Sequence, residues 1–334
     1  MTSKEQLRKQ ADFVSERYKK LNDDFLVMFG YLIYEHLEEK DFNKSEISSL
    51  KSKAMLRTRQ VKSDLKKIFA NQYKENNFKQ EMDDYMIMFP SVLDDIQNQI
   101  GITITKNGKR EFVGIDDIYK LFDGDMESLA KQAADSGLRV YQDGMSYRLD
   151  SYIRYCALKG IKDINSQVQE ILFEKMGANG WEIDYHANPR PSHAYMGGRQ
   201  FVVGKARTIN GIYFESFEEI ALPRLIEPNC LHFKIPIVCG VSKPLHTTEQ
   251  LAQWRKADQA KVKYAERTYT KYEATQVQKR LADEIRKCDD RLTVASSARL
   301  EYLRRVELSK RRVLFKEYDK FSKACGLERK IKNR

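Results

Sequence analysis

The sequence has few residues that break helices or form covalent crosslinks, and each shortage excludes a class of protein. Its 334 residues include only seven prolines and 16 glycines, which favours long helices. The five cysteines are odd in number and scattered, so a disulfide-held secreted protein is not expected and the thiols should be reduced. The longest apolar run, residues 25–34, is half the roughly 20 residues of a membrane-spanning helix. We expect a charge-rich soluble protein without a membrane partner.

Local motifs of common enzyme classes are also missing. The sequence contains no G-x-S-x-G, no P-loop and no G-x-G-x-x-G that follows a strand-like segment. The adjacent acids Glu218 and Glu219 have no partner at a catalytic spacing, which is typical of a solvated helix face. Local motifs therefore predict none of these enzyme classes.

Apolar residues at spacings of three and four predict long helices in the first 100 residues. The first row is Phe13, Arg17, Leu21, Phe25, Met28, Phe29, Leu32 and His36, in which Arg17 is the only polar residue before His36. Further rows begin near residues 47 and 78, and Pro90 ends the last one. We expect residues 1–100 to form a helical bundle or an extended helical hairpin.

The middle of the chain changes character. Alternating residues flank Asn107-Gly108, which predicts a β-hairpin within a connector at 101–134. Two short helices are expected at 148–159 and 166–176, ended by Gly160 and Gly177, and strands at 181–186 and 231–238. Six of the seven prolines lie between 189 and 244. Residues 135–246 are therefore expected to form a compact α+β module.

The last region, residues 247–334, carries the excess positive charge. It contains 24 lysines and arginines against 13 acids, a net charge of +11 that equals the net charge of the whole chain. A capping box, Thr247-x-x-Gln250, precedes one helical row from Leu251 to Cys288 and a second from Leu300 to Phe321. We expect two long antiparallel helices. The fold class is thus α+β and mostly helical: N-terminal bundle, small central module and C-terminal helical hairpin.

Three histidines and a cysteine gather in two short segments of the central module. His186 and His193 flank one segment, and Cys230 and His232 lie two residues apart in the other, on one face of a strand. Together they offer an N3S donor set for tetrahedral zinc, with the two segments meeting in space. The alternatives are a loop fixed by prolines, in which the histidines bind backbone groups and Arg190 pairs with a carboxylate, or a catalytic site. Arg190, Pro191 and Asn229 are expected to be structural.

Clusters of basic residues in the last region are candidates for contact with DNA phosphates or with an acidic protein surface. They are Arg304, Arg305, Lys310, Arg311, Arg312, Arg329, Lys330, Lys332 and Arg334. A solvated helix face with intrahelical ion pairs is the alternative. No base-reading motif is visible, so DNA contact would be independent of sequence.

Several segments in order, over about residues 130–334, resemble a known family. They are Arg148-Leu149-Asp150, residues 152–154, residues 177–186, Arg190-Pro191-Ser192-His193, Pro228-Asn229-Cys230-Leu231-His232, residues 240–251 and residues 276–287. The chain resembles tailed-phage minor capsid proteins of the second type, which are distantly similar to Mu F-like head-morphogenesis proteins. Some Mu F-like relatives carry Cys-x-x-Cys at the positions of 190–193 and Cys-x-Cys at those of 230–232, which keeps the zinc hypothesis open.

The resemblance implies a structural virion protein, not an enzyme. It implies a place at the portal vertex or capsid interior, with portal and capsid proteins and packaged double-stranded DNA as partners, and presence in the host cytoplasm during head assembly. Two alternatives remain: a metal-dependent nuclease that uses the His/Cys cluster, and a cytosolic module that binds nucleic acid without sequence preference.

Overall fold

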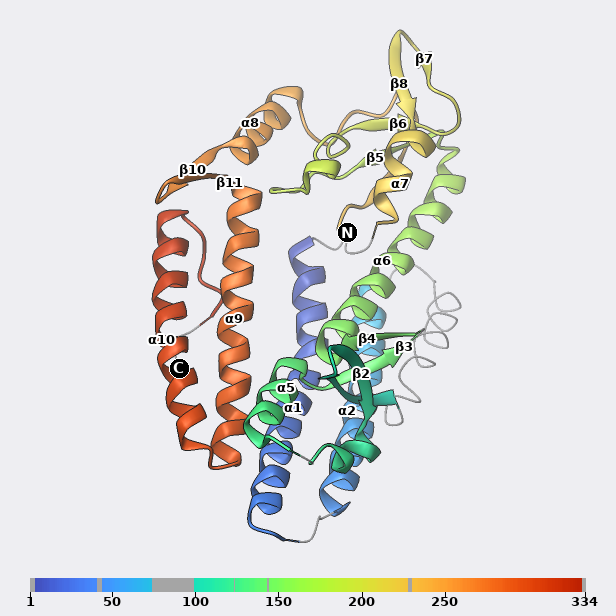
Figure 1. Ribbon diagram of the computed structural model, residues 1–334. Helices are drawn as coiled ribbons and strands as arrows, with labels where there is room; N and C mark the ends of the chain where they lie inside the picture. The colour runs from blue at the N-terminus through green and yellow to red at the C-terminus, as the bar shows by residue number, and fades with distance from the viewer. Residues whose placement is uncertain are drawn as a thin grey trace.

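The structure is a computed structural model that describes residues 4–40, 44–73, 99–122, 124–142, 144–227 and 230–331. It shows a mostly helical α+β protein of elongated shape (Figure 1). Long helices and a small sheet form a helical body, and a second sheet lies beyond one end of this body. The expected row from residue 78 to Pro90 lies outside the described residues.

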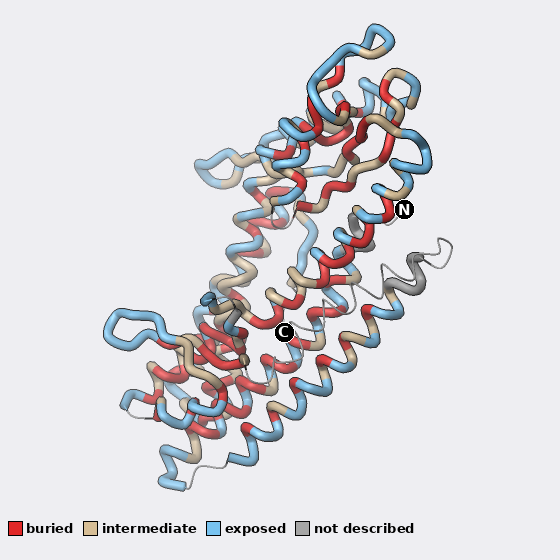
Figure 2. The backbone as a smooth tube through the Cα atoms, turned by 90° about the vertical axis from the view of Figure 1, so that its right-hand side faces the viewer, coloured by how far each residue is buried: buried red, intermediate tan, exposed pale blue. Residues whose placement is uncertain are grey.

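Five long helices build the helical body. They are α1 (Lys4–Leu37), α2 (Lys44–Tyr73), α5 (Met126–Ser136), α6 (Leu149–Met176) and α9 (Lys271–Ser297). α1 lies at the centre, because it packs against the other four. One continuous apolar core joins these helices, and Figure 2 shows its buried residues along the facing sides of the helices.

The row predicted along α1 is largely confirmed. Phe25, Phe29 and Leu32 are fully buried or nearly so, within the chain itself. Phe13 is 56% exposed, with the Arg17 guanidinium over its ring, and His36 is exposed, so both lie outside the core. At Gly30, α1 approaches α9 so closely that an added Cβ would lie 2.5 Å from the Ser297 Cβ.

The predicted hairpin at Asn107-Gly108 is confirmed. Both turn residues adopt positive φ, and they join β1 (Ile100–Lys106) to β2 (Lys109–Gly114). A 3₁₀ helix, η1 (Ile115–Leu121), follows. Two further strands, β3 (Arg139–Gln142) and β4 (Met145–Arg148), complete an antiparallel sheet of order β2-β1-β3-β4, so the hairpin belongs to the helical body.

One long helix, α6, replaces the two short helices expected on either side of Gly160. Residues Ala157, Ile161 and Ile164 continue one buried face across the glycine, and this burial outweighs the roughly 1 kcal/mol that glycine costs in a helix. The end at Gly177 is as predicted, with this residue in the left-handed conformation. α6 therefore runs without a break from the helical body to the second sheet.

The second sheet and its connections, residues 180–246, are called the sheet module below. Its strands are β5 (Gly180–Ile183), β6 (Gln200–Val202), β7 (Arg207–Ile209), β8 (Ile212–Ser216) and β9 (Lys234–Ile237), in the order β7-β8-β6-β5-β9. Only β6 and β8 pair in parallel among these strands. Short helical turns η2 (Pro191–His193), η3 (Phe217–Ala221) and α7 (Leu222–Leu225) connect them. A small core around Trp181 packs on Phe173 near the end of α6.

The prediction of a single helix from Leu251 to Cys288 is wrong. The chain forms α8 (Thr248–Gln259), a hairpin of β10 (Lys261–Tyr264) and β11 (Arg267–Thr270), and then α9. Residues at alternate positions of the hairpin, Val262 and Tyr264, pack with Tyr269 around Phe321 and Cys325. A second capping box, at Thr270 and Glu273, starts α9.

The predicted antiparallel pair at the end of the chain is confirmed by α9 and α10 (Glu301–Ala324), which lie side by side (Figure 1). The break between them falls after Ser297, slightly later than expected. Among the described helices, none combines the length and the low polarity needed to cross a membrane.

Candidate functional site

The His/Cys cluster lies where two connections of the sheet module meet. His193 ends the η2 turn, which Pro191 begins and which connects β5 to β6. Cys230 and His232 lie on the segment before β9. The expected strand begins only at Lys234, so these two residues are in extended chain and do not share a strand face. Asn229 lies outside the described residues.

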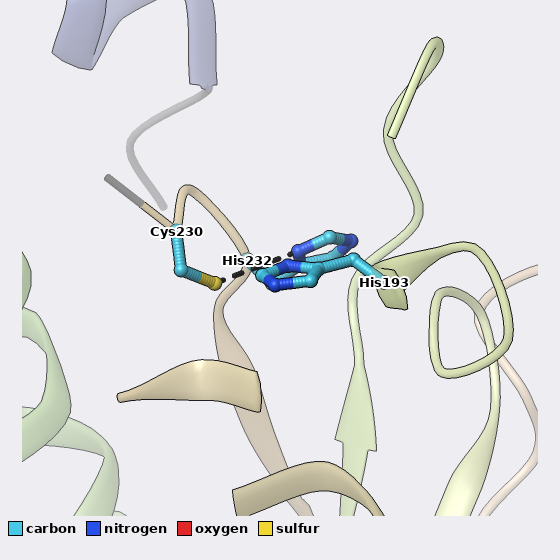
Figure 3. A group of neighbouring side chains, drawn as sticks. All are labelled: His193, Cys230 and His232. Carbon is cyan, nitrogen blue, oxygen red and sulfur yellow. Dashed lines mark hydrogen bonds between the residues drawn. The ribbon is translucent and has the colours of Figure 1, made fainter. Parts of the chain in front are cut away.

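The two segments meet, as predicted from the sequence. One ligand atom each of His193, Cys230 and His232 lies within 4.8 Å of the other two (Figure 3). The Cys230 Sγ is 3.7 Å from the His232 Nδ1. All three residues are buried, with exposed fractions of 2%, 5% and 1%. Two imidazoles and a thiol thus converge in a site that solvent hardly reaches.

A carboxylate supports the cluster from outside. Glu227 accepts a hydrogen bond of 2.8 Å from the His193 Nε2 and another of 3.1 Å from the Arg190 Nη1. The bond from His193 and the positive charge of Arg190 lower the pKa of Glu227 below its ordinary value. Arg190 therefore pairs with a carboxylate, as one sequence hypothesis expected. The role of Glu227 was missed, because 34 residues separate it from His193.

His186, the fourth residue of the sequence hypothesis, packs against the cluster. Its ring centroid lies 3.9 Å from that of His232, and the planes are inclined by 35°. The His193 and His232 rings are 5.5 Å apart. His186 is half-buried, and its Nδ1 lies 3.3 Å from the Ala187 carbonyl oxygen. The group of converging ligand atoms does not include it.

A cavity of about 300 Å³ opens beside the cluster, between α6 and the segment from η3 to β9. Its wall is mostly apolar, with Leu158 from α6 and Leu225 from α7, and it includes Cys230 and His232. Lys162 crosses it and donates a hydrogen bond to the Leu225 carbonyl oxygen. The cluster therefore borders both packed protein and this cavity.

The basic residues of the last region fall into two groups. Three of them pair with acids: Arg304 with Glu301, Arg311 with Asp289 and Arg329 with Asp319. The Arg311 side chain is only 7% exposed, so it joins α10 to α9 and does not present its charge to a partner. Arg305, Lys310, Arg312 and Lys330 are exposed. Lys332 and Arg334 lie outside the described residues.

One exposed stripe of charge on α10 was missed in the sequence. Arg305, Arg312, Lys316 and Lys323 are all exposed and recur at i, i+7, i+11 and i+18, which places them on one face of the helix. Their helical spacing was the available signal, since neighbouring pairs such as Arg311-Arg312 drew attention instead. We call these four residues the basic stripe; it spans roughly 27 Å along the helix axis.

Comparison with known proteins then identifies the class of protein. A family model described as phage minor capsid protein 2 matches residues 126–316, which cover more than half of the chain. The protein is therefore a structural component of the bacteriophage virion, and it assembles with other phage head proteins. The chain belongs to the phage minor capsid protein 2 family, as its resemblance implied. No curated protein and no solved structure matches it significantly.

The family match includes both features described above. It contains the whole sheet module with its His/Cys cluster, and α9 with most of α10. It leaves out α1, α2 and the β1–β2 hairpin. Membership indicates a structural role. The similarity to Mu F-like proteins stays a prediction.

Proposed function

We propose that the protein docks at the portal vertex or on the capsid interior during head assembly and genome packaging, and that its basic stripe contacts packaged double-stranded DNA. The observation that carries the DNA contact is the stripe on α10: four cations on one exposed helix face, in the region that holds the whole net charge of the chain. Ion pairs neutralise other cations of this region, but the stripe points outward.

Contact of this kind is electrostatic and independent of sequence. Arginine and lysine side chains along one helix face neutralise phosphates and release the counterions around DNA. Nothing in the stripe forms a base-reading element, because its residues supply charge alone. The affinity should therefore be similar for all duplex sequences and should fall steeply with salt.

The test is a salt titration of duplex DNA binding with the full-length protein. Arg305→Gln, Arg312→Gln and Lys316→Gln, made together, should weaken binding to all sequences and make the slope of log K against log salt shallower by up to about three. A matched control replaces three exposed lysines of the helical body, Lys20, Lys66 and Lys67, by glutamine. It carries the same change of net charge and should bind almost as the wild type does.

Two results would contradict the DNA contact. If both triple variants weaken binding equally, net charge and not the stripe drives it. If the wild type shows no affinity at about 50 mM salt, where phosphate contacts are strong, the stripe serves an acidic protein surface. Cleavage of the DNA in the presence of a divalent metal would favour the nuclease alternative.

Docking is tested separately in assembled particles. Virions purified from infected cells should contain the protein, and crosslinking followed by mass spectrometry should join it to portal or inner capsid proteins. Crosslinks confined to the outer capsid surface would contradict this placement.

A further inference from the structure

We infer that His193, Cys230 and His232 bind one zinc ion, which ties the β5–β6 connection of the sheet module to the segment before β9. The inference rests on the geometry of three buried side chains and not on the DNA contact. Two imidazoles and a thiolate form a donor set that suits zinc. Binding displaces the thiol proton of Cys230 to solvent, because the thiolate is the ligand.

The distances fit a shared tetrahedral ion. With usual zinc–sulfur and zinc–nitrogen bonds, two ligand atoms on one zinc lie roughly 3.5 Å apart. The Cys230 Sγ and His232 Nδ1 are 3.7 Å apart, and all three ligand atoms lie within 4.8 Å of one another. The longest of these separations exceeds the usual spacing by at most about 1.3 Å, which binding of the ion has to close.

The distances between ring centroids distinguish the histidines that bind zinc from the histidine that only packs beside them. Two imidazoles on a tetrahedral zinc place their ring centroids roughly 5 Å apart. The His193 and His232 centroids are 5.5 Å apart, which agrees with this value. His186 lies only 3.9 Å from His232, a separation typical of ring packing. The inference therefore assigns three protein ligands, leaves His186 outside the set and gives the fourth position of the tetrahedron to a water molecule from the adjoining cavity.

The contacts of His193 are those of a metal ligand. A histidine that binds a metal through one nitrogen commonly donates the other N–H to a carboxylate, which fixes the ring. The His193 Nε2 makes this bond to Glu227, at 2.8 Å, and Arg190 in turn holds the carboxylate. Nδ1 of His193 is then the nitrogen for the ion.

The sheet module has a physical need for such a link. Among the residues that the structure describes, its two apolar cores contain eight and four buried residues, against 40 in the core of the helical body, to which the module contributes Phe233. Small cores rarely stabilise a fold alone, and a structural metal is one common supplement. Cys230 already packs in the core around Trp181, and Phe233 packs in the core of the helical body, so zinc would add a direct link between the two segments.

The experiment uses the full-length protein after removal of any metal-binding tag. Elemental analysis should find one zinc per chain. After dialysis against a chelator, titration with Co²⁺ should give the visible bands of tetrahedral cobalt and a thiolate-to-cobalt charge-transfer band, complete at one equivalent. Protein from zinc-supplied cells that holds no zinc and gives no cobalt spectrum overturns the inference.

Matched variants identify the ligands. Cys230→Ser should lose the charge-transfer band and His193→Ala should lose the zinc, while Cys239→Ser and His246→Ala, in the same module but outside the cluster, should keep both signals. Glu227→Gln should weaken zinc binding by about 10–100-fold, as for other carboxylates behind a metal ligand. His186→Ala should leave the cobalt spectrum unchanged, and loss of the metal in this variant would contradict the three-ligand set.

A folded Cys230→Ser variant that retains its zinc would overturn the inference. If this variant fails to fold, X-ray absorption at the zinc edge of the wild type decides the question: one sulfur with nitrogen or oxygen neighbours supports the site, and a shell without sulfur excludes it.

Discussion

The helical body and the sheet module are stabilised in different ways. In the body, helices far apart in the sequence share one large apolar core, and α1 alone packs against four other helices. In the module, short strands enclose two small cores, and Glu182, Ser216, His193 and His232 are buried polar residues beside them. The body is therefore stabilised mainly by one large apolar core, whereas the module combines small apolar cores with buried polar groups. The predictions below test this difference, from the largest expected effect to the smallest.

Truncation of a core aromatic in the body should have the largest effect. Phe25 is fully buried and packs against Phe29, so Phe25→Ala should lower the free energy of unfolding by about 3–5 kcal/mol. Urea unfolding followed by circular dichroism measures this loss. Phe13→Ala, on the exposed side of the same helix, is the matched control and should change stability by less than about 0.5 kcal/mol. Equal losses in the two variants would contradict a core built on one face of α1.

The second largest loss of stability is expected at the ion pair that links α10 to α9. Arg311→Gln removes the partner of Asp289 from a largely buried pair and should cost about 1–3 kcal/mol, because Asp289 is itself partly exposed. The neighbouring Arg312 is exposed, so Arg312→Gln should leave stability unchanged and weaken only DNA binding. Thermal unfolding and the salt titration together separate these roles. A stable Arg311→Gln variant with weakened DNA binding would move Arg311 to the contact surface.

A smaller effect is expected where α1 meets α9. Alanine is the better helix former by about 1 kcal/mol, yet Gly30→Ala should destabilise the body by about 1–2 kcal/mol. The added Cβ would lie 2.5 Å from the Ser297 Cβ and 2.7 Å from the Val294 carbonyl oxygen. Chemical denaturation gives the sign directly. A gain in stability would show that the two helices can move apart at little cost.

The last comparison concerns the reactivity of the thiols and involves no change in the free energy of unfolding. Burial raises the pKa of Cys156 and of Cys288 to about 11, so both stay protonated well above pH 8 in the folded body. Since the thiolate is the reactive form, their alkylation should be roughly 100-fold slower at pH 8 than that of a free thiol and should accelerate as the pH rises towards 11.

The module thiol should respond to a different treatment. Cys230 should resist iodoacetamide while zinc is bound and react once a chelator has removed it, whereas the chelator should not change the rates at Cys156 and Cys288. Peptide mass spectrometry follows each cysteine separately. Chelator-dependent labelling in the body would contradict the separation between the two regions.

Local signals in the sequence predicted the elements that local chemistry determines. Asn107-Gly108 requires positive φ, so the hairpin could be predicted, and the spacing of Phe25, Phe29 and Leu32 marked the buried face of α1. The β10–β11 hairpin was missed because Tyr264 was assigned to the helical row from Leu251 to Cys288. Only the packing of Tyr264 and Tyr269 on Phe321, more than 50 residues away, decides in favour of strands. Gly160 was wrongly predicted to end a helix for the same reason, because burial of the helix face around it outweighs the low helix propensity of glycine.

The candidate site was predictable in its parts but not in its geometry. Prolines and clustered histidines indicated that residues 186–193 and 228–232 meet, and 193, 230 and 232 do converge. The sequence could not show that His186 would stack on His232, or that Glu227 would reach His193, because both depend on where the connections of the sheet turn. Arg311 could not be separated from Arg312, because Asp289 lies on another helix.

α6 runs without a break from the helical body to the sheet module, so it couples the position of one to that of the other. It packs into the apolar core of the helical body from Leu149 to Val168, and near its other end Phe173 stacks on Trp181 of the sheet module. Figure 1 shows this course of α6. With 28 residues at 1.5 Å each, the helix is roughly 42 Å long. Over this length, a rotation of about 5° at one end of the helix corresponds to a displacement of roughly 4 Å at the other end. A rigid helix of this kind converts small changes of angle at one end into a displacement at the other.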